Sequence, residues 1–432
     1  MNTPKTSAYK HPIFHGILLA IAFQLVMALI SVAVTLLLPP FFLENGDFLW
    51  QTVIEAFMCL AGVGFVALYG YNRIWKEKGS GIKGIVTGGF FIAIGLVSIG
   101  LVLYDSIDSQ RQLEVPWKIA VYVAWAFLVG ICEEVFFRGI LSNLFWDKHA
   151  KSPAGIWTAA IWSGLIFGLM HLFNMLNSMT ADYISSVISQ TIGAIMMGIA
   201  LTAIYYRCRN IRVLIILHGF YDLCAAFSSG VFAGGSLVDE IGSYTPSASP
   251  IIIYGIVTLV LLRPSKLNEI VAYRRSQEGF EYGELELPEQ QEKSKKFFIF
   301  TAVLAVALVV ALYSASVALY KSTFYVNYSE TNLFAANTTT FEQTVADFTA
   351  EESGSISIYV ESIPGIENAN VRVAVFSDDT VAFEEIYGGA CSDGQSIYVE
   401  EGKNYRVVVE YDFTQSEAIM DFAHAVSVGI KK

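Results

Sequence analysis

The chain has 432 residues, of which 54% are hydrophobic and 15% charged, and its mean hydropathy is +0.52. These values exclude an ordinary soluble protein and favour one with many membrane-spanning helices. The net charge of −12 comes from one part of the sequence, because residues 321–432 hold 18 acidic and 6 basic side chains. The preceding 320 residues are therefore neutral, and we expect no nucleic-acid partner.

Nine apolar runs, most of them about 20 residues long, predict helices that cross the membrane. The first run has lysines before it and no small-residue cleavage site after it, which indicates an uncleaved anchor. The eighth run is short, so we expect eight or nine spans. The runs lie near residues 13–38, 50–72, 84–104, 117–140, 154–176, 183–206, 211–232, 249–262 and 297–320.

Lysine and arginine gather in alternate loops, and this pattern predicts the orientation of the chain. The basic loops are 73–83, 148–151, 207–212 and 263–296, whereas the loops between them hold few positive charges. By the positive-inside rule, the basic loops and the N-terminus face the cytoplasm of a multi-pass cell-membrane protein. Nine spans then place the C-terminal region outside the cytoplasm.

Polar segments divide the chain into four expected regions. Most of the sequence is predicted to form a polytopic α-helical membrane bundle of about eight core spans, followed by a tethered all-β domain. The regions are 1–262 for the bundle, with its polar site on 117–232, 263–296 for a polar cytoplasmic linker, 297–320 for a final transmembrane helix, and 321–432 for an acidic extracytoplasmic domain.

The C-terminal region alternates short β-rich segments with turn signals. Such segments occur at 355–360, 371–376, 396–399 and 405–411, and their spacing is typical of a small antiparallel sandwich. The five cysteines of the chain form no CxxC pair, so no disulfide framework is expected. We find no catalytic cluster in this region, and both an extracellular ligand and an inert spacer role are compatible with it.

Two adjacent glutamates, Glu133 and Glu134, follow a long apolar stretch. Ionisable groups at membrane depth cost roughly 2.5–3.5 kcal/mol each, so such residues are usually functional. Glu134 and Arg138 are four residues apart and share a helical face, which predicts an ion pair between them. Glu133 points about 100° away and is free to act as a general base, a general acid or a metal ligand. The alternative is that both glutamates end the helix at the cytoplasmic interface.

A second motif places Phe167, His171 and Asn174 on one face of a later apolar helix. On the same helix, Gly164 and Gly168 form a small-x-x-x-small pair that allows another helix to approach closely. His171 is compatible with two roles, because a lone histidine on an apolar helix is often a satisfied core residue rather than a ligand.

A third motif places His218 and Asp222 one helical turn apart. The two side chains can bind one cation together, or the carboxylate can orient the imidazole. A polar bridge between helices is the alternative. Three polar motifs on three apolar helices are nevertheless hard to explain by packing alone.

The order Glu-Glu-x-x-x-Arg, Phe-x-x-x-His and His-x-x-x-Asp, from Glu133 to Asp222, resembles the CPBP family of intramembrane metalloproteases. This family includes type II CAAX prenyl endopeptidases and bacterial Abi, or bacteriocin-processing, proteins. The resemblance covers about residues 115–232. It implies that Glu133 activates water, that His171 and His218 complete the catalytic site, and that the neighbouring ion pair supports them.

The resemblance also implies a divalent metal ion, with zinc expected first and manganese or cobalt permitted. Glu133, His171, His218 and Asp222 are the expected ligands. The family usually has asparagine at the last motif position. Asp222 adds charge there, which favours a metal but weakens a role as oxyanion donor, so Asn174 is an alternative donor.

We therefore expect a glutamate-dependent intramembrane endopeptidase that hydrolyses a lipidated or membrane-associated peptide. Its substrate could be a prenylated CAAX peptide, a leader peptide or a bacteriocin in self-immunity. One alternative chemistry uses the thiol of Cys132 as nucleophile, although a buried apolar thiol is usually inert. The alternative functions are a non-proteolytic scaffold or immunity protein and an ion-coupled transporter with the same buried polar residues.

Overall fold

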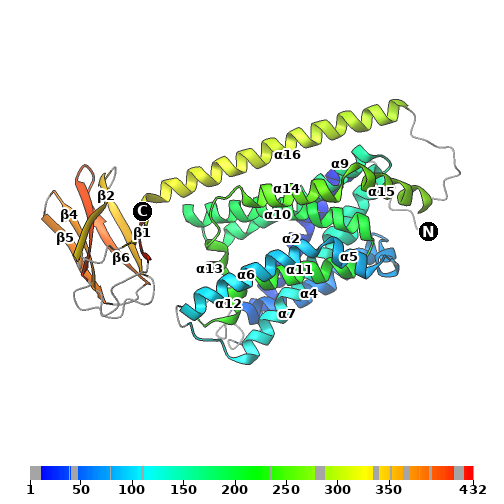
Figure 1. Ribbon diagram of the computed structural model, residues 1–432. Helices are drawn as coiled ribbons and strands as arrows, with labels where there is room; N and C mark the ends of the chain where they lie inside the picture. Colours follow the sequence, from blue (N-terminus) through cyan, green and yellow to red (C-terminus); the bar gives the residue numbers. More distant parts are fainter. Residues whose placement is uncertain are drawn as a thin grey trace. The chain divides into compact units, whose positions relative to one another are not determined.

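The chain divides into a helical unit that ends at Val317 and a β-rich unit that begins at Ala318 (Figure 1). Each unit is described by itself. The computed structural model describes residues 11–37, 39, 47–77, 79–108, 111–233, 236–277, 288–333, 340–350, 353–362, 370–378, 380–388, 392–412 and 423–431.

The helical unit is an array of long apolar helices joined by short connections. Most of them begin and end close to the predicted runs. In chain order they are α2 (Pro12–Leu37), α4 (Asp47–Leu68), η1 (Asn72–Lys76), α5 (Gly81–Thr87), α6 (Gly89–Asp108), α7 (Pro116–Glu133), η2 (Glu134–Ser142), α8 (Asn143–His149), α9 (Pro153–Met170), η3 (His171–Asn177), α10 (Ala181–Cys208), α11 (Ile211–Ala225), α12 (Phe227–Val231), α13 (Leu237–Gly242), α14 (Ser249–Leu261), α15 (Pro264–Gln277) and α16 (Pro288–Thr323).

Among the described residues, six helices are long and apolar enough to cross a membrane, or up to eight if two bent pairs each form one span. The pairs are α5 with α6, bent by 55°, and α14 with α15, bent by 60°. The expected eight or nine spans stay a prediction, because these candidates are assigned by length and composition alone. The run predicted over 211–232 breaks after Ala225, and a 15-residue helix is shorter than the roughly 20 residues that a span needs.

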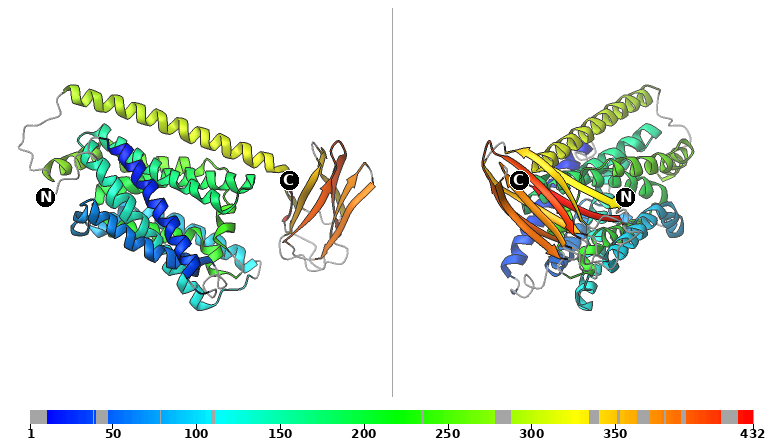
Figure 2. Two further views of the ribbon diagram at one scale, coloured as in Figure 1. Left: turned by 180° about the vertical axis from the view of Figure 1, so that it is seen from behind. Right: turned by 60° about the vertical axis from the view of Figure 1, so that its left-hand side comes forward.

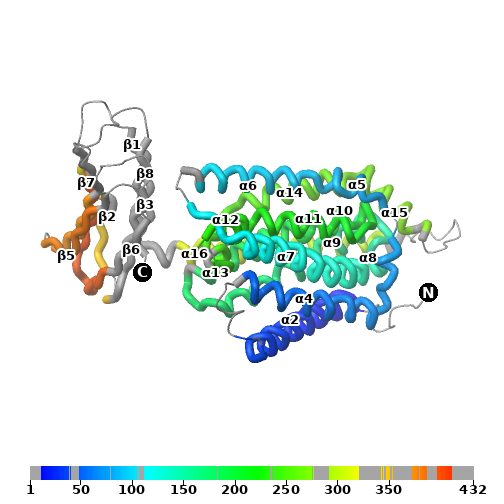
Figure 3. Tube along the Cα trace, turned by 90° about the horizontal axis from the view of Figure 1, so that it is seen from below, coloured from blue at the N-terminus to red at the C-terminus, as the bar shows by residue number. Residues whose placement is uncertain are grey.

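α10 lies at the centre of the helical unit. Inside its apolar window 83% of the residues are buried in protein, against 11% for α16, which leaves the surface of α16 to face lipid. α10 packs against α9 and α14, while α7 packs between α4 and α11. Figure 3 shows α7 and α11 between α6 and α2, and Figure 2 shows α2 along the outside of the bundle, where it contacts α4 and α9.

Glycines allow the site-bearing helices to approach closely. A Cβ on Gly168 would lie 2.4 Å from the backbone nitrogen of Ile195, and one on Gly130 would lie 2.8 Å from the backbone nitrogen of Gly219. The first contact joins α9 to α10 and the second joins α7 to α11. The predicted small-x-x-x-small contact of Gly164 and Gly168 is thus present, because both glycines meet the backbone of α10.

The expected linker 263–296 is partly structured. Its first part forms α15, in which Leu267, Ile270 and Val271 are buried, and its last part forms the start of α16. Burial of an apolar stripe explains why this charged stretch is helical. The acidic middle over 278–287 lies outside the described residues.

The β-rich unit contains two four-stranded antiparallel sheets, with strand orders β1-β8-β3-β6 and β2-β7-β4-β5. The central pair of the second sheet aligns Val373 with Val409 and Val375 with Val407, and all four valines are buried. The four predicted β segments form β3, β4, β6 and β7. The strands are β1 (Phe324–Leu333), β2 (Thr340–Thr349), β3 (Gly354–Ser362), β4 (Asn370–Ser377), β5 (Thr380–Gly388), β6 (Ser392–Val399), β7 (Asn404–Asp412) and β8 (Ala423–Lys431).

Candidate functional site

The paired glutamates lie where α7 passes into η2, a π-helical segment of nine residues. π-Helical turns are rare and occur frequently at functional sites. Glu134 Oε1 accepts a hydrogen bond from Arg138 Nη1 at 2.8 Å, and both side chains are completely buried. The Glu133 side chain is 24% exposed. The two carboxylates therefore differ as the spacing predicts, since one is paired and enclosed and the other is accessible.

Arg138 holds three helices together. Its Nη2 donates to the backbone oxygen of Gly198 on α10 at 3.2 Å. Its guanidinium carbon lies 4.4 Å from the centroid of the Phe167 ring on α9, which is a cation–π contact. The ion pair with Glu134 is thus fixed by the neighbouring helices as well as by its own.

His218 of α11 completes this pair and faces the accessible carboxylate. Its Nδ1 donates to Glu134 Oε1 at 2.7 Å, since an ionised carboxylate can only accept. Its Nε2 lies 3.5 Å from Glu133 Oε2 and 3.7 Å from Asp222 Oδ2. His218 is 2% exposed, so its ring is held between the enclosed pair and the two other carboxylates.

The Phe167 ring lies among the basic residues of the site. Its centroid is 5.1 Å from that of His171 and 5.8 Å from that of His218, and the rings meet edge to face. His171 Nδ1 donates to the backbone oxygen of Phe167 at 3.2 Å. His171 and His218 are therefore linked by their contacts with the same Phe167 ring. Within the described part of the chain it shows no ion pair between His171 and a carboxylate.

Asn174 and Asp222 differ in how their polar atoms are used. Asn174 Nδ2 donates to Gln190 Oε1 of α10 at 2.9 Å, which ties η3 to that helix. Asp222 Oδ2 is buried and has no hydrogen-bond partner among the described residues. Asp222 therefore presents an unsatisfied carboxylate oxygen near His218, whereas the amide of Asn174 already has a partner.

Glu55 of α4 is a further buried carboxylate, absent from the motifs. It is 6% exposed, forms a hydrogen bond with the thiol of Cys132, and lies within electrostatic range of Asp222 and Glu133. A lone glutamate inside a predicted span is itself a signal of function, and this rule identifies Glu55 without any motif. The same contact gives the buried thiol of Cys132 a partner.

Of the four residues expected to bind a metal, His218 lies near Glu133 and Asp222, at 3.5 and 3.7 Å, whereas His171 contacts Phe167. Among the described residues, no group of three or more His, Cys, Asp and Glu side chains could hold a metal ion.

The family model described as type II CAAX prenyl endopeptidase Rce1-like matches residues 115–224. The matched region is about a quarter of the chain and contains all three motifs, from Glu133 to Asp222. It confirms the resemblance seen in the sequence. No curated protein and no solved structure matches the chain.

Proposed function

We propose that the protein is an intramembrane endopeptidase, because residues 115–224 match the model of the type II CAAX prenyl endopeptidase Rce1-like family. The family and the apolar helices support a protease in a multi-pass membrane protein, with a membrane-associated peptide as substrate. We further propose that Glu133 activates the water that attacks the peptide bond.

The observation that carries this assignment is the meeting of Glu133 and His218. Glu133 is the partly exposed member of the glutamate pair, and its Oε2 lies 3.5 Å from His218 Nε2. The other ring nitrogen of His218 is held by Glu134, which is held in turn by Arg138. A base next to an oriented imidazole is the arrangement that hydrolysis by water requires.

In the proposed reaction, Glu133 accepts a proton from water, and the resulting hydroxide attacks the carbonyl carbon of the substrate. The tetrahedral intermediate collapses when the peptide C–N bond breaks and the leaving amine receives a proton from Glu133 or from His218 Nε2. His171 donates its Nδ1 proton to the Phe167 carbonyl, so its Nε2 would polarise the carbonyl oxygen of the substrate only when the ring is doubly protonated. Charge stabilisation at that oxygen is commonly the largest contribution to such a reaction.

The finer points of substrate and topology are part of the same proposal. The substrate is a lipidated or membrane-associated peptide, and the N-terminus faces the cytoplasm. The two sheets of the C-terminal unit pack face to face as a sandwich outside the cytoplasm, where they could bind a ligand. Buried Ile397 and Val399 on one sheet and Val373 and Val409 on the other support this packing.

The cofactor remains a prediction from the sequence. A divalent ion, zinc first, would supply a Lewis acid that lowers the pKa of its bound water. Elemental analysis of the purified wild type and of Glu133→Gln tests it. A stoichiometric metal in the wild type that is lost in the variant supports the prediction.

The activity is tested with the full chain in liposomes and a library of prenylated and unmodified peptides, with products identified by mass spectrometry. Loss of a general base typically costs about 10²–10⁴ in rate, so Glu133→Gln should lose cleavage by that factor. His171→Ala and His218→Ala should also lose it. Glu114→Gln, a change in a surface pair with Lys118, is the matched control and should retain it.

Two outcomes would contradict the proposal. Cleavage that survives Glu133→Gln but is lost in Cys132→Ala would assign the chemistry to the thiol. A cellular phenotype that persists in all three site variants would favour a scaffold or a transporter instead.

A further inference from the structure

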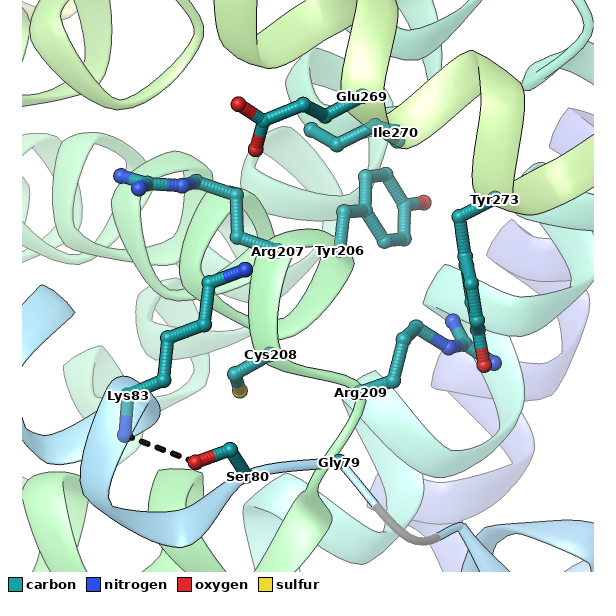
Figure 4. Close-up of a pocket in the computed structure, with 10 residues that line it drawn as sticks. All are labelled: Gly79, Ser80, Lys83, Tyr206, Arg207, Cys208, Arg209, Glu269, Ile270 and Tyr273. Carbon is teal, nitrogen blue, oxygen red and sulfur yellow. Dashed lines mark hydrogen bonds between the residues drawn. The ribbon is translucent and has the colours of Figure 1, made fainter.

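A cavity of about 440 Å³ opens where the turn before α5, the C-terminal end of α10 and α15 meet (Figure 4). Its volume lies within the roughly 300–1,000 Å³ typical of small-molecule sites. Three cationic side chains line it, namely Lys83, Arg207 and Arg209, together with one carboxylate, that of Glu269. The cavity is separate from the candidate protease site, because none of the motif residues lines it.

Arg209 is the fixed cation of this cavity. It is 4% exposed, and its Nη2 donates to Glu77 and, at 3.0 Å, to Asn143 Oδ1. Its Nε and Nη1 have no hydrogen-bond partner in the part of the chain that the structure describes. Its φ of 46° is a left-handed conformation that favours glycine, so an arginine is held here at a backbone cost. Nε and Nη1 are both buried, so Arg209 adds a fixed positive charge at the wall of the cavity rather than an exposed donor.

The other two cations, Lys83 and Arg207, lie within electrostatic range of Glu269 but are not paired with it. Lys83 and Arg207 form no ion pair with any described residue. The carboxylate of Glu269 is already engaged, since its Oε1 accepts Lys266 Nζ at 2.5 Å. Figure 4 shows the Lys83 and Arg207 side chains on one side of the cavity and Arg209 beside Tyr273 on the other. The cavity therefore has an excess of positive charge.

The cavity adjoins apolar surface that has no protein cover. Ile82 and Val86 of α5 are 81% and 75% exposed, and α5 begins one of the bent candidate spans. The mouth thus lies where the hydrocarbon-facing surface of the helical unit meets its basic end. That is the level at which the phosphates of a bilayer lie.

We propose that this cavity binds a phosphate group, delivered as the headgroup of an anionic membrane lipid. Arg209 supplies a fixed positive charge at the wall, and Lys83 and Arg207 donate to the phosphate oxygens. A free phosphate ion could make the same contacts. Its binding is therefore measured separately, to distinguish a lipid headgroup from the free ion as the ligand. The proposal is independent of the proteolytic activity.

Native mass spectrometry of the full chain in detergent tests the proposal, with phosphatidylglycerol and phosphatidylcholine of the same acyl chains as probes. Phosphatidylglycerol should bind at one saturable site and phosphatidylcholine should not. The variant Lys83→Gln/Arg207→Gln should weaken this binding about tenfold or more, because two cations near an anionic headgroup are removed. The control Lys76→Gln/Arg212→Gln removes the same charge from exposed positions outside the cavity and should change it less than about twofold.

The charge-conserving variant Lys83→Arg/Arg207→Lys should retain binding of the lipid. Such a result would show that Lys83→Gln/Arg207→Gln weakens binding through lost charge and not through misfolding. Inorganic phosphate should displace the lipid only weakly. If it binds alone with the same dependence on Lys83 and Arg207, the cavity is a phosphate site whose source is the free ion. Equal weakening by both double variants, or equal binding of the two lipids, would overturn the proposal.

Discussion

His218 Nδ1 lies 2.7 Å from Glu134 Oε1, the same oxygen that accepts Arg138 Nη1 at 2.8 Å. One buried oxygen thus serves two donors from two helices, α11 and η2. The shared oxygen fixes the orientation of the His218 ring, and this orientation directs Nε2 toward Glu133 and Asp222. The enclosed glutamate therefore positions the histidine that faces the accessible one.

Glu134→Gln should destabilise the protein and reduce cleavage together. The amide keeps one acceptor oxygen but removes the charge that Arg138 and His218 share, and removing one partner of a buried pair typically costs about 3–5 kcal/mol. The thermal unfolding midpoint in detergent measures the first effect, and the rate of peptide cleavage measures the second. Glu114→Gln, which weakens a partly exposed pair with Lys118, should leave both values nearly unchanged. An unchanged midpoint for Glu134→Gln would contradict the positioning role.

Phe167→Leu should reduce kcat more than it reduces stability. The ring contacts Arg138, His171 and His218, and a leucine offers none of them an aromatic face. The lost cation–π contact and packing are expected to cost about 1–3 kcal/mol, while cleavage falls at least tenfold because two histidines change position. Phe145→Leu is the matched control, because Phe145 is equally buried. It should lose similar stability and retain kcat, and equal losses of kcat in the two variants would contradict a specific role for Phe167.

Helix geometry explains which parts of the site could be predicted from the sequence. The Glu134–Arg138 pair follows from spacing along one helix, and the small-x-x-x-small contact of Gly168 follows from the absence of a side chain. The bond between His218 and Glu134 joins residues 84 positions apart, and periodicity within each helix contains no information on the register between them. That register depends on the close approach of Gly130 to Gly219.

Two further features could not be predicted for related reasons. The contact of the Phe167 ring with both His171 and His218 was not predicted, because spacing along one helix does not determine which side chain packs against a neighbouring helix. The span count rested on hydropathy windows, which detect apolar residues but not the break between α11 and α12. The β segments of the C-terminal region were predicted where apolar and polar residues alternate strongly, as in β4 and β7.

Glu55→Gln should raise the stability of the protein at neutral pH. The carboxylate is buried on α4 within electrostatic range of Glu133 and Asp222, and like charges at low dielectric repel one another. Glutamine has the same shape and retains a hydrogen bond to the thiol of Cys132. The thermal midpoint should therefore rise, by an amount corresponding to about 1 kcal/mol or more. Glu55→Ala, which removes the charge but leaves a cavity, should not show this gain, and a lower midpoint for Glu55→Gln would mean that Glu55 stabilises the fold.

Gly168→Ala should separate α9 from α10 and destabilise the helical unit. A Cβ at this position would lie 2.3 Å from the Ile195 side chain and 2.4 Å from the Ile195 backbone nitrogen. A side chain can turn aside but a helix backbone cannot, so the two helices must move apart, at a cost of about 1–3 kcal/mol. Because η3 continues from α9, this movement also displaces His171, and we expect cleavage to fall with the thermal midpoint.

Gly64→Ala is the matched control for this prediction. Gly64 lies inside α4, where an added Cβ meets nothing within 4 Å, so the same substitution fills open space. Alanine is favoured over glycine by about 0.5–1 kcal/mol inside a helix. The thermal unfolding midpoint of Gly64→Ala should therefore be unchanged or higher. If both variants behave alike, the effect at Gly168 comes from helix propensity. A loss confined to Gly168→Ala instead shows that the close contact between α9 and α10 stabilises the helical unit.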